Sequence, residues 1–421
     1  MPLRKLVLEN YRCFRDRQEI ELAPVTVVLG KNNSGKSVLT RAPLVIATGF
    51  DTTSELPLDL DRLGPDAVDD WADLHFGQNV YRPFTIGLSV DGRRTFDLSA
   101  TIQYVDLIRR PVLQRWSIRS ATFNATLTWD VPSAAVVSSE GPRAYARERP
   151  SGLRTVGPVS FQGLRPGLDE FPAAEMRRWG LSPGLIRYLG PYRERWGRQH
   201  RMPLGGPGDV GDNGAGVPGI LAYDQVRHGG ALLDSVNRRL RDIVPGWRLD
   251  EVADGSRWKT VLTREDGGKL QVNLADAGSG LAQVLPILVQ CALDERDGSA
   301  SDPPLQIIEE PEMHLHPAAH AELADLYLRT AKATGTRFLV ETHSETLLLR
   351  LRRRIAQQDY PPEMVAVHVV EQVDGVSTVR RVGIDGLGNL DDDWPEGYFS
   401  QDYHEVRGLA KAQARRRRDA S

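Results

Sequence analysis

The chain has 421 residues, enough for two or three domains, and its 40% hydrophobic and 26% charged content is that of an ordinary globular protein. A formal net charge of -3 gives no overall attraction to nucleic acid. With only Cys13 and Cys291, a disulfide scaffold and a cysteine-rich zinc module are excluded. The N-terminus lacks the apolar core of a signal peptide, and no apolar run approaches membrane-spanning length. We therefore expect a cytoplasmic protein without a membrane partner.

The N-terminal segment predicts two strands and a helix. Residues 3–8 and 19–29 are rich in β-prone side chains, and the second run ends V-T-V-V-L directly before Gly30. A helix is expected from Ser37, and Pro43 should kink it or end it early. Residues 51–80 are polar and rich in Gly, Pro and Asp, which predicts a loop with short helices.

The middle of the chain predicts antiparallel strands and then helices. Alternating apolar residues indicate strands from 84 to about 131, whereas the Ser-, Pro-, Gly- and Arg-rich stretch 133–167 predicts a loop. Residues 168–245 hold helical stretches, which a Gly-rich run at 202–219 interrupts. That run lacks a Lys-Ser ending, so we expect a mobile loop and no second phosphate-binding loop.

The C-terminal part alternates strands and helices. Strands are predicted at 246–274, 305–308, 338–341 and 364–383, and a basic tail ends the chain. Between the first two strand regions, a helix starting at Gly280 has apolar residues at helical spacing. Its predicted buried face consists of Leu281, Val284, Leu285, Leu288 and Val289.

The segment G-K-N-N-S-G-K-S fits the phosphate-binding pattern G-x-x-x-x-G-K-[ST] without mismatch. It follows a predicted strand and opens a helix, so its backbone N–H groups would surround a β-phosphate. Lys36 would reach the β- and γ-phosphates of ATP, and the Ser37 hydroxyl would bind Mg²⁺. A chance Gly-rich turn is the alternative. The predicted nucleotide-binding residues are Gly30, Lys31, Asn32, Asn33, Ser34, Gly35, Lys36 and Ser37.

A second motif, L-Q-I-I-E-E-P-E-M-H-L-H-P at 305–317, places two acids at the end of a buried strand. Glu309 would hold Mg²⁺ through water, and Glu310 would polarise the attacking water as general base. Two alternatives remain open. The acids could belong to a salt-bridge network at the strand end, or His314 and His316 could bind zinc with neighbouring acids.

Two further motifs predict contacts to phosphate. F-L-V-E-T-H-S-E at 338–345 is a strand ending in polar groups, and His343 is suited to contact a γ-phosphate. D-A-G-S-G-L-A-Q at 276–283 places small residues before a helix N-terminus, which favours an anion delivered from a second subunit. The alternative is an ordinary helix cap made by Ser279 or Asp276.

In this order the motifs resemble the ATP-binding-cassette (ABC) heads of the RecF/SMC type, and are most similar to bacterial ATPases related to the overcoming-lysogenization-defect (OLD) family. Three further segments share the resemblance: L-E-N-Y-R-C-F at 8–14, Y-L-G-P-Y-R at 188–193 and W-P-E-G-Y-F-S-Q-D at 394–402. The resemblance implies an α/β P-loop NTPase fold of ABC-head type. OLD-type proteins often carry a Toprim nuclease after the head, but the stretch after Ser344 is short, so we expect none here.

The resemblance also implies roles for single residues. Two heads would sandwich two ATP molecules head to tail, with Ser279 and Gly280 closing on the γ-phosphate of the opposite subunit. Arg12 would lie near the nucleotide, and Gln78 is the candidate for a glutamine that senses Mg²⁺ and water. The head would then be split in sequence. Its halves are expected at 1–84 and 246–400, with a β-rich and helical insertion at 85–245 and a basic tail at 401–421.

These inferences lead to three functional hypotheses. The first is an ATP-hydrolysing switch that forms a homodimer or higher even oligomer and controls a separate effector protein, in bacterial defence against phage. The second is a DNA-binding ATPase of repair or maintenance, in which arginines at 350–354 and at 193, 195, 198 and 201 contact phosphates. The third is a scaffold that binds ATP without hydrolysing it, against which the intact Glu310 argues.

Overall fold

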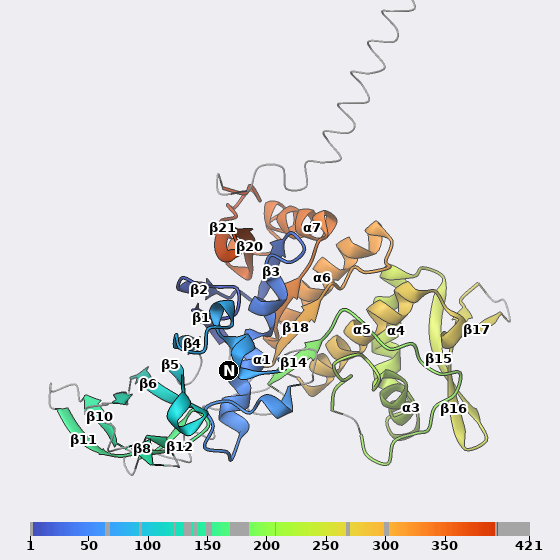
Figure 1. The fold of residues 1–421 in the computed structure, drawn as a ribbon. Coiled ribbons are helices and arrows are strands. Elements are labelled where there is room, and N and C mark those ends of the chain that lie inside the picture. Colours follow the sequence, from blue (N-terminus) through green and yellow to red (C-terminus); the bar gives the residue numbers. More distant parts are fainter. Residues whose placement is uncertain are drawn as a thin grey trace, which may run out of the picture.

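The structure is a computed structural model with a central sheet between two lobes (Figure 1). One lobe is a large antiparallel sheet, and the other holds helices and a small three-stranded sheet. The structure describes residues 3–63, 68–91, 95–121, 123–129, 137–138, 141–142, 144–148, 154–168, 185–206, 208–266, 270–298, 303–391 and 394. The basic tail and all but Trp394 of the segment 394–402 lie outside these residues.

The central sheet has six strands, and every neighbouring pair is parallel except the last. Its inner strands are almost entirely buried runs of Val, Leu and Ile, the pattern of a parallel sheet covered on both faces. Because the strands run in parallel, their carboxyl ends meet at one edge. In spatial order they are β14 (Ile186–Leu189), β18 (Leu305–Glu309), β19 (Arg337–Glu341), β3 (Val25–Gly30), β20 (Val365–Val373) and β21 (Val376–Val382).

Helices cover both faces of this sheet. Val25, Val27 and Leu29 of β3 belong to the core formed with α5, α6 and α7, whereas Val28 belongs to the core that contains α1. The alternation follows from the two-residue period of a strand. The helices are α1 (Lys36–Asp51), α3 (Val217–Arg227), α4 (Ala231–Ile243), α5 (Ser279–Asp297), α6 (Pro317–Thr334) and α7 (Glu345–Ala356).

Two features of the N-terminal segment differ from the simplest expectation. Pro43 does not end helix α1, which continues to Asp51, because burial of its later residues, including Val45, Ile46 and Phe50, offsets the lost hydrogen bond. A kink at Pro43 stays a prediction. The run 19–29 is not one strand. It is divided into β2 (Gln18–Glu21) and β3, which lie in different sheets.

The antiparallel sheet has eight strands and confirms the strands predicted from 84 onward. Buried and half-buried residues alternate along β5, so one face of the sheet packs on the core. In spatial order the strands are β11 (Arg154–Pro158), β10 (Ala144–Glu148), β7 (Asn124–Trp129), β6 (Arg110–Ser120), β5 (Phe96–Val105), β4 (Phe84–Val90), β1 (Leu3–Glu9) and β2.

The predicted loop at 133–167 is wrong, because β10 and β11 extend the eight-stranded sheet. The backbone pairing of β10 with β7, and of β11 with β10, compensates for a polar sequence with little apolar alternation. The same stretch also contains β8 (Val137–Ser138), β9 (Gly141–Pro142), β12 (Ser160–Gln162) and β13 (Arg165–Gly167).

Two predictions for the helical lobe are confirmed. All five residues predicted for the buried face of α5 are buried, and the strands expected at 246–274 form a three-stranded sheet. Those strands are β15 (Trp247–Asp254), β16 (Arg257–Arg264) and β17 (Gln271–Asn273). Short 3₁₀ helices at Leu60–Arg62, Trp71–Leu74 and Phe76–Gln78 confirm the expectation for 51–80. Within the described parts of the chain, no helix is long and apolar enough to cross a membrane.

The expected division at residues 84 and 245 stays a prediction. Strand β4 begins at Phe84 and pairs with β1, and β14, from the middle segment, pairs with β18 of the central sheet. The middle segment therefore contributes directly to the sheet that carries the predicted nucleotide site.

Candidate functional site

The phosphate-binding loop connects the end of β3 to the start of α1, and two of its glycines are required by close contacts. A Cβ on Gly30 would lie 2.5 Å from Ser34 Oγ and 2.6 Å from the Val370 carbonyl oxygen. Gly35 has φ +103°, and a Cβ there would lie 2.5 Å from Cys13 Sγ. These positions allow no larger side chain without movement. The loop geometry therefore depends on the glycines that the sequence motif contains.

A cleft of about 490 Å³ lies beside this loop and joins it to the ends of two other strands. Two acids line its wall. Glu310 directly follows β18, and Glu341 is the last residue of β19. The sequence predicted most of this wall but not Cys13, Val38 or Glu341. The complete lining is Cys13, Asn32, Asn33, Gly35, Lys36, Ser37, Val38, Glu310 and Glu341.

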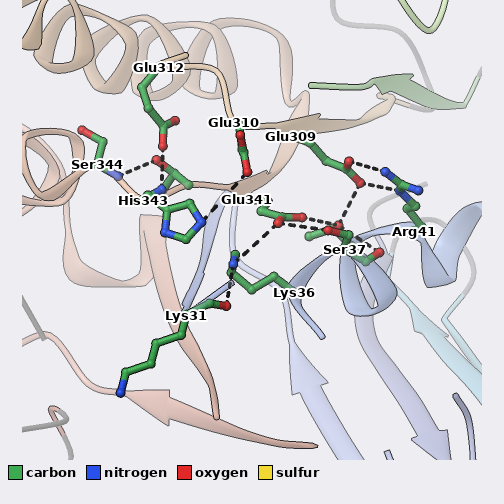
Figure 2. Close-up of polar contacts among 12 residues, drawn as sticks. Lys31, Lys36, Ser37, Arg41, Glu309, Glu310, Glu312, Glu341, His343 and Ser344 are labelled. Carbon is green, nitrogen blue, oxygen red and sulfur yellow. Dashed lines mark hydrogen bonds and ion pairs between the residues drawn. The ribbon is translucent and has the colours of Figure 1, made fainter. Parts of the chain in front are cut away.

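Lys36 is buried at the base of the cleft. Its Nζ donates a hydrogen bond to the Lys31 carbonyl oxygen at 2.9 Å and lies 3.9 Å from Glu341 Oε1 (Figure 2). Burial lowers the pKa of the Lys36 ammonium, and the nearby carboxylates of Glu341 and Glu310 oppose this shift. The ammonium is therefore held inside the loop, where a phosphate group would be its natural anionic partner.

Glu341, at the end of β19, faces the Ser37 hydroxyl. Ser37 donates to Glu341 Oε1 at 3.0 Å (Figure 2). Burial, and then the neighbouring charge of Glu309, raises the pKa of Glu341 to about 7. Oxygen ligands of this kind, hydroxyl and carboxylate, are those that Mg²⁺ prefers. Ser37 and Glu341 therefore fit a magnesium ion that accompanies a nucleotide.

Glu309 lies in a different arrangement. Arg41 Nε donates to its Oε1 at 2.7 Å and Arg41 Nη2 to its Oε2 at 2.6 Å, and the Tyr188 hydroxyl donates to Oε2 at 3.1 Å. Hydrogen bonding to Glu309 raises the pKa of Arg41. The Glu309 side chain is only 2% exposed and does not line the cleft. The structure thus places Glu309 within a salt-bridge network, one of the alternatives that the sequence left open.

Glu310 follows β18 and has a positive φ of 43°, a conformation that costs a non-glycine residue of order 1–3 kcal/mol. Its N–H donates to the Glu341 carbonyl oxygen at 2.8 Å, which fixes the turn. The carboxylate lies 4.0 Å from His343 Nε2. Burial, and then the charge of Lys36, lowers the pKa of His343, so the imidazole is neutral near pH 7. A carboxylate beside a neutral imidazole is an arrangement able to position a water molecule.

The two histidines after Glu310 do not form a zinc site. The His316 side chain accepts a hydrogen bond from the Ala318 N–H at 3.2 Å and thereby caps α6. Across the described segments no cluster of three or more His, Cys, Asp or Glu side chains could hold a metal ion alone. The zinc alternative is therefore not supported.

Ser279 and Gly280 open helix α5, as the sequence predicts. The helix N-cap is Gly278, which makes no side-chain cap, and Asp276 pairs with Arg198. The alternative of a cap made by Ser279 or Asp276 is therefore wrong. Ser279 is exposed, and a Cβ on Gly280 would lie 2.7 Å from the His314 carbonyl oxygen. Neither residue lines the cleft of its own chain, so their contact with a γ-phosphate from a second subunit stays a prediction.

Arg12 and Gln78 each contact the segment Asp73–Leu74 and lie outside the cleft lining. The Arg12 N–H donates to the Leu74 carbonyl oxygen, and its neighbour Cys13 lines the cleft. Gln78 is exposed, and its side-chain amide donates to Asp73 at 3.0 Å. Their roles toward a nucleotide stay predictions.

Several arginines considered for DNA contact are engaged within the protein. Arg193 is 7% exposed and donates to the carbonyl oxygens of Gln283 and Glu309, so it cannot contact DNA. Arg350 and Arg354 both pair with Asp325. These contacts engage two of the four arginines at 350–354.

The geometry matches that of a P-loop ATPase head, and comparisons with known proteins agree. Residues 217–350 match the family model "AAA domain, putative AbiEii toxin, Type IV TA system", and residues 1–48 match the "AAA ATPase domain". The chain therefore contains AAA-type ATPase domain sequence in both predicted halves of the head. No curated protein matches the chain.

Solved structures identify the fold. The Smc head bound to the C-winged-helix domain of ScpA matches with a TM-score of 0.51 and 13% identity, covering 91% of this chain and 98% of that one. The SMC head of Thermotoga maritima matches at 0.41 with 15% identity, covering 91% and 100%. An Smc head from Pyrococcus furiosus, bound to the C-terminal domain of ScpA, matches at 0.46 with 12% identity, covering 90% and 96%. The predicted α/β fold, a P-loop ATPase of ABC-head type, is confirmed.

Proposed function

We propose that the protein binds ATP with Mg²⁺ and hydrolyses it to ADP and phosphate. The observation that carries this proposal is the convergence of Lys36, Ser37, Glu341 and Glu310 on one cleft, with His343 beside it. These groups come from three parallel strands and match the parts that phosphoryl transfer requires. Those parts are a cationic loop, oxygen ligands for a metal ion and a carboxylate that can orient water.

Each residue has a distinct part in the proposed reaction. The loop N–H groups and Lys36 bind the phosphates, and Ser37 contributes its hydroxyl to the metal site. Mg²⁺, when bound, neutralises the charge that develops on the phosphates. Glu310 accepts a proton from the attacking water, and the neutral imidazole of His343 donates a hydrogen bond toward the γ-phosphate. The fixed turn at Glu310 holds the base in place while the reaction proceeds.

The proposed active form is a homodimer, or a higher even oligomer, in which each nucleotide lies between two heads. The N-terminus of α5 has no side-chain cap, so its backbone N–H groups are available to an anion. Ser279 is exposed there and does not line the cleft of its own chain. A second subunit could therefore present Ser279 and Gly280 to the γ-phosphate.

The dimer is proposed to act as a switch for a separate effector protein in defence against phage. Closure with ATP and release after hydrolysis would give two states with different surfaces, which an effector can distinguish. The family matched by residues 217–350 is named for a putative toxin of a type IV toxin–antitoxin system, which supports a role of this kind. Co-purification from the native host should recover the effector, and recovery of no partner with or without ATP would contradict the switch.

Steady-state ATP hydrolysis tests the catalytic part of the proposal. The purified protein should release phosphate from Mg²⁺–ATP, and Glu310→Gln should lower the rate at least about a hundredfold while ATP still binds. Glu265→Gln, an exposed acid of the helical lobe that pairs with Arg241, is the matched control and should keep the parental rate. Hydrolysis by Glu310→Gln at the parental rate would refute the assigned base. Binding without hydrolysis by the parental protein would favour the scaffold hypothesis.

A further inference from the structure

The hydrogen-bonding capacity of the Glu309 carboxylate is almost fully used within the chain. An ionised carboxylate accepts about four hydrogen bonds. Glu309 accepts two from Arg41 and one from Tyr188, and Thr40 Oγ1 lies 3.4 Å from Oε1 as a shared fourth donor. The guanidinium also balances its charge. Contact with a metal ion, or with water bound to one, would require Glu309 to give up part of a bidentate ion pair.

Glu341 is also buried, but it has different neighbours. It lines the cleft together with Lys36, Ser37 and Glu310, whereas Glu309 does not. Within the chain, Ser37 donates to Oε1 at 3.0 Å, Thr40 lies 3.4 Å from Oε2, and Lys36 Nζ lies 3.9 Å from Oε1. This carboxylate therefore keeps acceptor capacity on the side of the phosphate-binding loop.

The spacing of Ser37 and Glu341 also suits a magnesium ion. Mg²⁺ holds its oxygen ligands at 2.0–2.1 Å in an octahedron, which places neighbouring ligand oxygens about 2.9 Å apart. Ser37 Oγ and Glu341 Oε1 are 3.0 Å apart in the structure. The two oxygens are thus already arranged as neighbours around one small cation, without movement of either strand or helix.

We infer that Glu341 is the carboxylate that faces the metal ion of the bound nucleotide. The sequence alone had assigned metal binding to Glu309. This inference rests on the proposed ATP binding. Glu309 is instead a positioning residue. Through Arg41 and Tyr188 it connects helix α1 to strands β18 and β14 and so holds the phosphate-binding loop against the sheet.

The order of the strands explains how a carboxylate of β19 reaches this position. Strand β19 lies between β18 and β3, and Glu341 aligns with Val28 of β3 and with Glu309 of β18. It is therefore closer to the phosphate-binding loop, which follows β3, than an acid on β18 is. Lys36 and Ser37, at the start of α1, both contact it.

The test is the effect of Mg²⁺ on ATP binding, measured by titration calorimetry in Mg²⁺ and in EDTA. The parental protein should bind ATP more tightly with Mg²⁺, and Glu341→Gln should lower the apparent Mg²⁺ affinity of the ATP complex about 10–100-fold. In EDTA, Glu341→Gln should bind ATP at least as tightly as the parental protein, because a negative charge near the phosphates is removed. Glu265→Gln is the control and should bind like the parental protein in both buffers.

Glu309→Gln separates the two assignments. This variant should still bind ATP more tightly in Mg²⁺ than in EDTA. If Glu309→Gln does not fold, the double variant Arg41→Gln with Glu309→Gln takes its place, because it leaves no unpaired charge. Retention of the Mg²⁺ effect in Glu341→Gln, or an equal loss in the Glu309 variants, would overturn the inference. Failure of the parental protein to bind ATP in either buffer would instead refute the proposed function.

Discussion

Replacement of Arg41 by methionine should destabilise the protein far more than the loss of a surface ion pair would. Arg41 supplies hydrogen bonds of 2.7 and 2.6 Å to a carboxylate that is 2% exposed. Breaking a buried pair from one side costs about 3–5 kcal/mol, because a buried charge is left unpaired. Arg41 itself is 21% exposed, and Tyr188 would still donate to Glu309. We therefore expect a loss near the lower limit, about 3 kcal/mol.

The assay is urea unfolding of the parental protein, the variants Arg41→Met and Glu309→Gln, and their combination. Because Glu309→Gln removes the buried charge, the double variant should lose less free energy of unfolding than the sum of the two single losses. The Tyr188→Phe variant removes one donor only and should cost less than Arg41→Met. A loss below about 1 kcal/mol for Arg41→Met, the value typical of an exposed pair, would refute the buried network.

Three more results are expected. Lys36→Ala should bind ATP much more weakly in fluorescence titrations, since the phosphates lose their main cationic partner; unchanged affinity would contradict its assignment. Ser279→Arg should keep ATP binding but abolish ATP-dependent dimers in sedimentation experiments, because the exposed Ser279 is proposed to contact the nucleotide of the second head; intact dimers would contradict that contact. Burial lowers the pKa of His368 to about 4, below the unfolded value of 6.5, so the unfolding free energy should fall between pH 6.5 and 4 by on the order of 3 kcal/mol. His368→Leu should flatten this dependence in pH-resolved urea unfolding, and an unchanged slope would contradict the assignment.

The sequence predicted those parts of the site that depend on local patterns. Gly30 to Ser37 must follow a strand and open a helix for the loop to bind phosphate, and both neighbours are visible in the residues themselves. The buried face of α5 was likewise predicted from apolar residues at helical spacing. Such features need no knowledge of which strands are neighbours.

Features that depend on tertiary neighbours were not predicted. Glu341 belongs to the motif at 338–345. Its contact with Ser37 depends on β19 lying next to β3, and the spacing of residues along the chain does not reveal that neighbour. The contact of Arg41 with Glu309 joins residues far apart in the sequence. A signal was available in retrospect, because Arg41 lies one helical turn after Ser37 and so on the same side of α1.

The errors in the fold have the same origin. Strands β10 and β11 are polar and short, and the pairing of β10 with β7 and of β11 with β10 decides their structure. Arg193 looked like a surface cation, but its segment passes between α5 and β18, where buried carbonyl oxygens accept its hydrogen bonds. In each case the tertiary environment outweighed local composition.

We propose that ATP holds two heads together and that Glu310 ends this state by hydrolysis. Light scattering with size-exclusion chromatography of Glu310→Gln in Mg²⁺–ATP measures the mass of the proposed ATP-bound species. We predict a stable species of twice the chain mass of 46.8 kDa, or a higher even multiple, which disappears when Lys36→Ala is added to the same chain. A Glu310→Gln protein that has the same mass with and without ATP, although it binds the nucleotide, would contradict the account.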